Sequence, residues 1–317
     1  MSEFTLHGAT LAFAWYFGVN AAASLAIASI ARRGAFRRTA SPSIAFGARM
    51  LPAAAAGAFV AALFVPSYWR FEPRDGVEGF DVTLSMLAIG GAAIVAAGLV
   101  RGADAWRRAR RRMDVWMRSA RPIALASAGI PAFEIDVDAP MLALAGVVRP
   151  RLLVTRGLRA ALTPEELDAS VAHELGHRRA FDNLKRLAMR AAPDLLALLP
   201  SAGAIERRWA SAAEHSADLH AGHGAARRCA LASALVKVAR LAPPATPAAE
   251  PISTLVGGGD IASRVQRLLG EPSSRPRVRR HKLAAVAVAA AASVAFAYVP
   301  LLAGVHELTE LLVRVLP

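Results

Sequence analysis

The sequence predicts a mainly α-helical integral membrane protein with a smaller α+β domain between its third and fourth membrane-spanning helices. Three observations predict this fold class: long apolar segments, arginines clustered beside them, and short strand and helix patterns in between. The chain of 317 residues is 55% hydrophobic, has a mean hydropathy of +0.37 and carries a net charge of +14. Soluble enzymes seldom combine these values, whereas membrane proteins with basic loops do.

Four segments approach the roughly 20 mostly apolar residues that a helix needs to cross a bilayer. They are residues 11–30, about 46–65 (which can be extended back to Ile44), 82–100 and 283–302. The predicted domains are therefore 1–101 with three spans, 102–282, the fourth span, and a short tail at 303–317. Residues 195–205 are apolar but too short and contain Pro200, so a membrane-facing or re-entrant element and buried core both remain open.

The loop charges predict the orientation of these spans. Basic residues are dense at 32–38, 101–112 and 275–282, whereas residues 70–81 mix two arginines with four acidic residues. By the positive-inside rule the N-terminus and C-terminus lie outside and residues 101–282 are cytoplasmic, in a multi-pass protein of the cell membrane. Because the arginines lie beside apolar spans, the lipid bilayer explains them better than nucleic acid, which is not an expected partner.

Residues 173–177 read H-E-L-G-H, an instance of H-E-x-x-H. Residues four apart share one face of a helix, so His173 and His177 can bind one metal ion. Glu174 lies beside them and is the candidate general base. This arrangement is typical of a zinc hydrolase.

The residues before the motif predict a well-defined helix. Thr163, Pro164 and Glu166 match a capping box with proline at the first helical position. Apolar residues then recur every four positions from Leu167 to Leu175. The two histidines therefore lie on a capped amphipathic helix, which we expect to continue through residues 178–190.

A hydrolytic zinc site needs a third protein ligand and an open fourth position. The Ala-rich residues 209–221 predict a helix on which Glu214 and Asp218 share one face. We expect Glu214 to be the third ligand and Asp218 to orient a ligand histidine. The alternatives are a third ligand among His215, His220 and His223, or a solvated face for the two acids. A structural zinc site is disfavoured because such sites favour cysteine, and the chain has one Cys.

Other patterns predict the surroundings of the site. Residues 132–137, 142–148 and 151–155 are predicted strands, and an edge strand beside the metal could bind an extended peptide. The basic residues 101–121 predict an amphipathic helix on anionic lipid, with a plain linker helix as the alternative. Residues 243–259 predict a mobile loop, followed by a short helix at 261–269.

Residues 146–154, 162–167, 172–177 and 182–184 together resemble the BlaR/MecR-type membrane zinc metallopeptidases, over roughly residues 1–302. The pair Glu214 and Asp218 is similar to the E-x-x-x-D element of HtpX/Ste24-type membrane proteases, a related gluzincin group. The resemblance implies a zincin-like metallopeptidase domain with one Zn²⁺ per chain, bound by His173, His177 and Glu214, with Glu174 as catalytic base. Only about 15 residues follow the last span, so direct β-lactam sensing is not expected.

The function expected from the sequence is zinc-dependent endopeptidase activity on a cytoplasmic or membrane-proximal protein or peptide. His220, His223 and Arg227 are candidates for a second oxyanion donor or a substrate contact. One alternative is a signal-transducing protease that cleaves a repressor or itself and responds to a regulatory partner protein. The other is a non-catalytic membrane scaffold with a vestigial site.

Overall fold

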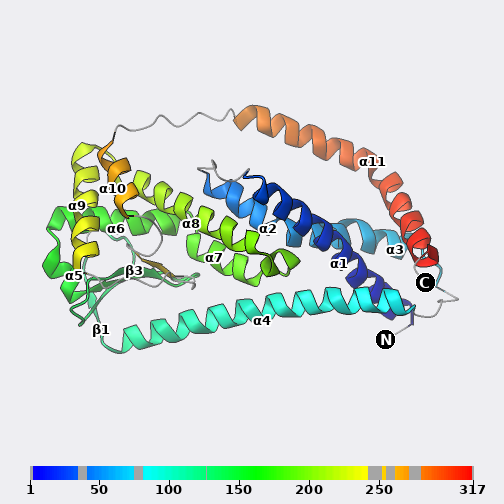
Figure 1. Ribbon diagram of the computed structural model, residues 1–317, viewed down its shortest axis with the longest axis horizontal. Coiled ribbons are helices and arrows are strands. Elements are labelled where there is room, and N and C mark those ends of the chain that lie inside the picture. Colours follow the sequence, from blue (N-terminus) through cyan, green and yellow to red (C-terminus); the bar gives the residue numbers. More distant parts are fainter. Residues whose placement is uncertain are drawn as a thin grey trace.

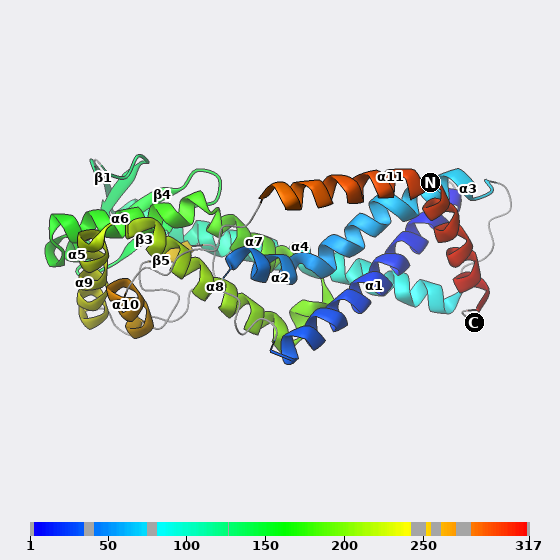
Figure 2. The ribbon, with the colours of Figure 1, turned by 90° about the horizontal axis from the view of Figure 1, so that it is seen from above.

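The computed structural model describes residues 3–34, 41–74, 81–125, 127–241, 252–254, 261–270 and 280–315, without the side chains of 252–254 and 280–296. The molecule is elongated, with long helices at one end and a small sheet with shorter helices at the other (Figure 1, Figure 2). Both ends of the chain lie at the end remote from the sheet (Figure 1).

Three described helical segments are long and apolar enough to cross a membrane, by length and composition. They are α1 (Glu3–Arg32), the segment Pro42–Phe71 and α4 (Val82–Arg118), and they contain the three spans predicted from residues 11, 46 and 82 onward. The second segment consists of α2 (Pro42–Phe59), a π-helical turn η1 (Val60–Phe64) and α3 (Val65–Phe71). Pro66 lies just after the π turn and lacks a backbone N–H, which accounts for the local change in helix type.

Helix α4 continues without a break through residue 101, where the first predicted domain ends. Its last turns pack on the sheet, where Ala109, Met113, Trp116 and Met117 cover Leu153 and its neighbours. The apolar stripe predicted to lie on lipid therefore packs against protein at these positions. Helix α4 thus also forms a layer against the sheet.

The sheet has the strand order β1-β2-β4-β3-β5 among the described residues. The strands are β1 (Ala120–Ile123), β2 (Ala132–Ile135), β3 (Leu142–Ala145), β4 (Arg151–Thr155) and β5 (Ile252–Thr254). Only β2 and β4 are parallel. The three predicted strands are present, although β2 and β3 end earlier than expected. Strand β5 lies within the predicted loop 243–259, whose other residues are outside the described part of the chain.

Alternating side chains connect the sheet to helices on both faces, as a period of two requires. Leu152 and Val154 join the core formed with helices α6 (Pro164–Arg179) and α9 (Ala225–Leu241), whereas Leu153 faces α4. The remaining helical elements are α5 (Arg156–Ala161), α7 (Asp182–Ala191), η2 (Leu195–Leu198), α8 (Pro200–Ala221), α10 (Ile261–Leu269) and α11 (Arg280–Val315). The sheet thus lies between α4 and a layer of shorter helices.

The helix predicted to continue through residues 178–190 is interrupted. Helix α6 ends at Arg179, Phe181 has a left-handed φ of 56°, and α7 begins at Asp182. Asn183 then donates hydrogen bonds to the carbonyls of Leu144 (2.9 Å) and Gly146 (3.1 Å), which tie the start of α7 to β3. These contacts offset the cost of an αL conformation in a bulky residue.

The fourth predicted span, residues 283–302, lies within α11. The helix continues to Val315 instead of ending in a tail after residue 302, and it contains Pro300. Because the side chains before residue 297 are not described, membrane crossing by α11 stays a prediction.

The membrane helices contact the turn between α7 and α8. Tyr16 Oη (2.7 Å) and Asn20 Nδ2 (3.0 Å) donate to the Pro193 carbonyl, and Arg49 Nη1 donates to Asp194 Oδ2 at 2.6 Å. In residues 195–205, Leu196, Ala202 and Ile205 pack in a core with residues of α1 and α2, whereas Leu198 is 73% exposed. Three residues of this stretch are therefore buried in protein core, and Pro200 begins α8 instead of breaking a helix.

The capping box predicted for α6 is present. The Thr163 hydroxyl accepts from the Glu166 amide, and the Glu166 carboxylate accepts from the Thr163 amide at 2.9 Å. We expect Thr163→Ala to lower the free energy of unfolding by about 1 kcal/mol, because one amide of the first turn loses its partner. Denaturation of the full chain in one detergent measures this, with Thr163→Ser as the control that keeps the hydroxyl. Equal stability of the two variants would contradict this role.

Candidate metal centre

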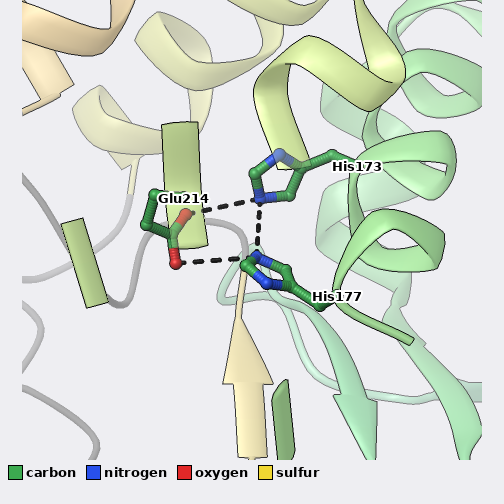
Figure 3. A group of neighbouring side chains, drawn as sticks. All are labelled: His173, His177 and Glu214. Atoms are coloured by element: carbon green, nitrogen blue, oxygen red, sulfur yellow. Dashed lines mark hydrogen bonds and ion pairs between the residues drawn. The ribbon is translucent and has the colours of Figure 1, made fainter. Parts of the chain in front are cut away.

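Three buried side chains from two helices converge on one point (Figure 3). Helix α6 supplies His173 and His177, and α8 supplies Glu214. The two Nε2 atoms lie 3.2 Å apart, His173 Nε2 lies 3.4 Å from Glu214 Oε2, and His177 Nε2 lies 3.6 Å from Glu214 Oε1. All three side chains are at most 2% exposed. They thus form a compact group of two nitrogens and a carboxylate.

The separations test whether these residues fit a zinc ion. Two ligands at zinc distances of about 2.1 Å and tetrahedral angles are about 3.4 Å apart. The three observed separations of 3.2, 3.4 and 3.6 Å lie close to this value. The donor set and its spacing therefore fit zinc.

Gly176 explains how α8 comes close enough to bring Glu214 to the histidines. A Cβ atom at Gly176 would lie 3.0 Å from the Cα atom of Ala217, which is tighter than normal van der Waals contact. The glycine inside the motif therefore allows close packing of α6 against α8.

Each histidine is oriented by a carboxylate on its other ring nitrogen. Asp218 Oδ1 lies 3.0 Å from His173 Nδ1, and Asp182 Oδ2 lies 2.8 Å from His177 Nδ1. This arrangement favours a proton on each Nδ1 and directs the Nε2 lone pairs toward the shared point. Asp218 is the residue expected from the sequence to do this, whereas the contact of Asp182 was not predicted, because it depends on the chain reversal at Phe181.

Arg264 is a further site residue that sequence reasoning missed. It lies on α10, is 1% exposed, and contacts Asp218 through Nη2 (2.6 Å) and Nε (3.0 Å). Its Nη1 lies 3.1 Å from Glu214 Oε2. The guanidinium thus connects the expected third ligand to the carboxylate that orients His173. The amphipathic pattern of residues 261–269 predicted the helix but not the inward position of this arginine.

The site is rich in buried negative charge. Four carboxylates are at most 3% exposed: those of Glu174, Asp182, Glu214 and Asp218. Among the described side chains, the buried guanidinium beside this group is that of Arg264. Burial lowers the pKa of His177, but Glu214 and Asp182 outweigh it and raise the pKa to about 10. Burial likewise raises the pKa of Glu214, but His177 and His173 hold that pKa well below its usual range. The surroundings therefore favour a bound cation.

A cavity of about 460 Å³ opens beside His177. Its lining is mostly apolar with a basic edge and includes Leu144, Val147, Val148, Phe181, Leu184, Arg178 and Arg179. Space for another molecule thus exists directly beside a proposed metal ligand.

The three residues expected to contact an oxyanion or substrate lie at the end of α8 and just beyond it, and a Cβ atom at Gly176 would lie 3.3 Å from the Cβ atom of His220. His220 is half-buried near the end of α8, whereas His223 and Arg227 are exposed. Burial, followed by Arg179 and His223, lowers the pKa of His220. Among the described residues, no hydrogen bond or ion pair joins these three side chains to His173, His177 or Glu214. Their contact with an oxyanion or substrate stays a prediction. Among the described side chains, Glu214 completes the group with His173 and His177.

Comparison with protein families gives one match. Residues 108–213, about one third of the chain, match the model of Peptidase family M48. No curated protein matches the chain. The matched segment contains strands β1 to β4 and both histidines, and it ends one residue before Glu214. The matched segment is therefore similar to Peptidase family M48, and the buried group of potential metal ligands is consistent with a metallopeptidase.

Proposed function

We propose that the chain is a membrane-embedded zinc-dependent endopeptidase that hydrolyses peptide bonds in a cytoplasmic or membrane-proximal protein. The observation that carries this proposal is the convergence of His173, His177 and Glu214 beside a cavity, with Glu174 on the same helix. A non-catalytic scaffold would not need this group of residues. The four buried carboxylates around it lower the stability of the fold unless cations offset their charge.

The chain's own residues divide the chemistry among them. A zinc ion held by His173, His177 and Glu214 supplies a Lewis acid that activates water and polarises a carbonyl. Glu174 is fully buried on α6 and acts as the base that accepts the water proton and passes it to the leaving nitrogen. Arg264 and Asp218 position Glu214 and His173, so that the ligands do not have to reorganise on binding.

Membrane embedding is supported by the three long apolar helices and by their contacts with the catalytic domain. The ends of the chain lie opposite the metal centre, which fits the predicted topology with external termini and a cytoplasmic catalytic domain (Figure 1). We further propose that the chain resembles BlaR/MecR-type and HtpX/Ste24-type membrane proteases in its organisation.

The sheet favours a regulatory or self-cleaving form of this activity as a second candidate. Strand β5 pairs antiparallel with β3, with Ser253 opposite Leu144, and it contacts α6 and α7. The edge of β3 is thus covered by the chain itself. A substrate that pairs with β3 as an extended strand would have to displace β5, or this segment is itself a substrate.

Cleavage mapping tests the second candidate. We expect wild-type protein to accumulate new termini between α9 and α10, and we expect Glu174→Gln to produce none. Termini that form equally in both proteins would indicate a contaminating protease, and an intact segment in active wild type would exclude self-cleavage there.

Metal removal tests the proposed function itself. We expect the purified full chain in detergent to cleave an unfolded protein such as casein, to lose this activity with ortho-phenanthroline, and to regain it when zinc is added. The reason is that the proposed mechanism depends on a metal ion to lower the pKa of the attacking water and to polarise the carbonyl. The non-chelating meta isomer of phenanthroline is the matched control. Cleavage that persists after the zinc has been removed would contradict the proposal.

A further inference from the structure

A second group of potential metal ligands lies at the opposite end of the molecule. Glu72 directly follows α3, while His306 and Glu310 lie four residues apart on α11. The i,i+4 spacing places His306 and Glu310 on one helix face, and Glu72 approaches from a different part of the chain. All three side chains are half-buried.

The distances suit a shared ion better than a direct hydrogen bond. His306 Nδ1 lies 3.7 Å from Glu72 Oε2, which exceeds hydrogen-bond length. It is close to the separation of about 3.4 Å expected for two ligands of one zinc-sized ion. The ligand atoms of the three residues all lie within 4.8 Å of one another, as do those of His173, His177 and Glu214.

The surrounding contacts hold this face of α11 in place. The ring of His306 stacks on Phe71, with centroids 5.7 Å apart and planes at 27°. The buried Ser67 hydroxyl donates to the Leu302 carbonyl at 2.7 Å, and Trp15 Nε1 donates to Thr309 Oγ1 at 3.1 Å. These contacts fix both the height and the rotation of α11 against α1 and α3, so the helix that carries His306 and Glu310 is held in place.

The cation that pairs with Glu310 is weakly placed. Arg314 Nη2 lies 3.5 Å from Glu310 Oε2, and its side chain is 76% exposed. An exposed pair of this kind contributes little to stability, so a metal ion can replace it at small cost.

We propose that Glu72, His306 and Glu310 form a second site for a divalent transition-metal ion such as zinc, distinct from the catalytic centre. One imidazole and two carboxylates are a donor set that suits such an ion, with water completing its shell. Because the ligands come from α3 and α11, the bound ion fastens the last helix to the second membrane-spanning segment. Under the predicted topology the site faces the outside of the cell.

Metal stoichiometry of the full chain in detergent tests this site separately from the catalytic one. After equilibration with zinc and removal of unbound metal, we expect two zinc ions per chain in wild type. His306→Ala and His173→Ala should each lose one equivalent, and the double variant should lose both. Glu307→Gln removes an exposed carboxylate from the same helix and should keep both ions.

Glu310→Gln is a milder substitution, so misfolding is a smaller concern. It should weaken zinc binding at the second site only. In the His173→Ala background, zinc should raise the melting temperature, and His306→Ala should remove that shift. One zinc per wild-type chain that His306→Ala leaves unchanged, or a second zinc that survives His306→Ala, would overturn the second site. Neither result would contradict the catalytic proposal. The zinc ion that His306→Ala still binds measures the occupancy of the catalytic centre by itself.

Discussion

Glu174→Gln is expected to lower the rate of peptide-bond cleavage roughly a thousandfold while leaving zinc bound, because glutamine cannot accept the water proton. Glu174 is not one of the three converging ligands, so the metal centre should survive the substitution. The measurement is kcat/KM on a labelled unfolded substrate, with zinc content determined on the same sample.

The matched control is Glu165→Gln. Glu165 lies in the exposed first turn of the same helix, far along α6 from the histidines, and its loss should leave cleavage unchanged. Zinc-loaded Glu174→Gln that cleaves at the wild-type rate would show that another group is the base.

Arg264→Met is expected to cost about 3–5 kcal/mol in the free energy of unfolding, because it leaves buried carboxylates without their counter-charge. Arg264 contacts Asp218 through two nitrogens and Glu214 through the third. We also expect zinc affinity to fall, since Glu214 loses the group that positions it. Denaturation and competitive chelation measure the two effects.

Arg267→Met is the control for this prediction. Arg267 lies one turn further along α10 and is exposed. Its Nη1 donates a hydrogen bond to Ser263 Oγ at 3.4 Å. Its replacement removes the same charge from the same helix and should change neither stability nor zinc affinity by much. Equal stability and affinity of the two variants would contradict the role of Arg264.

The parts of the site that the sequence could predict rest on local signals. The capping box at Thr163 and the H-E-x-x-H motif lie within one helix, where spacing alone determines which residues share a face. Glu214 and Asp218 were selected by the same i,i+4 rule on a second helix. Glu214 lies 37 positions after His177, and pairing the two helices needed the further assumption that the acids face the metal.

The parts that could not be predicted depend on tertiary contacts. Asp182 reaches His177 because Phe181 turns the chain, and no Gly or Pro marks that turn. Arg264 is one of 38 basic residues, and nothing in its local sequence distinguishes a buried partner of Asp218 from a surface charge. Strand β5 is three residues long and is defined by its pairing with β3.

Helix α4 shows the same limit at the scale of an element. Its sequence indicates an apolar span followed by an amphipathic stretch, and both are present in one continuous helix. Periodicity identifies the apolar face but not what covers it. The stripe at Met113 and Trp116 could have been covered either by lipid or by the sheet. In the structure it packs against the sheet, at Leu153.

X-ray absorption at the zinc edge tests the central claim most directly. The sample is the zinc-loaded full chain carrying His306→Ala, so that the catalytic centre alone contributes. We predict a first shell of two imidazole nitrogens with carboxylate and water oxygens at about 2.0–2.1 Å, and loss of bound zinc in Glu214→Ala. A shell with three imidazoles, or zinc binding that is unchanged by Glu214→Ala, would contradict the assignment of His173, His177 and Glu214 as the ligands.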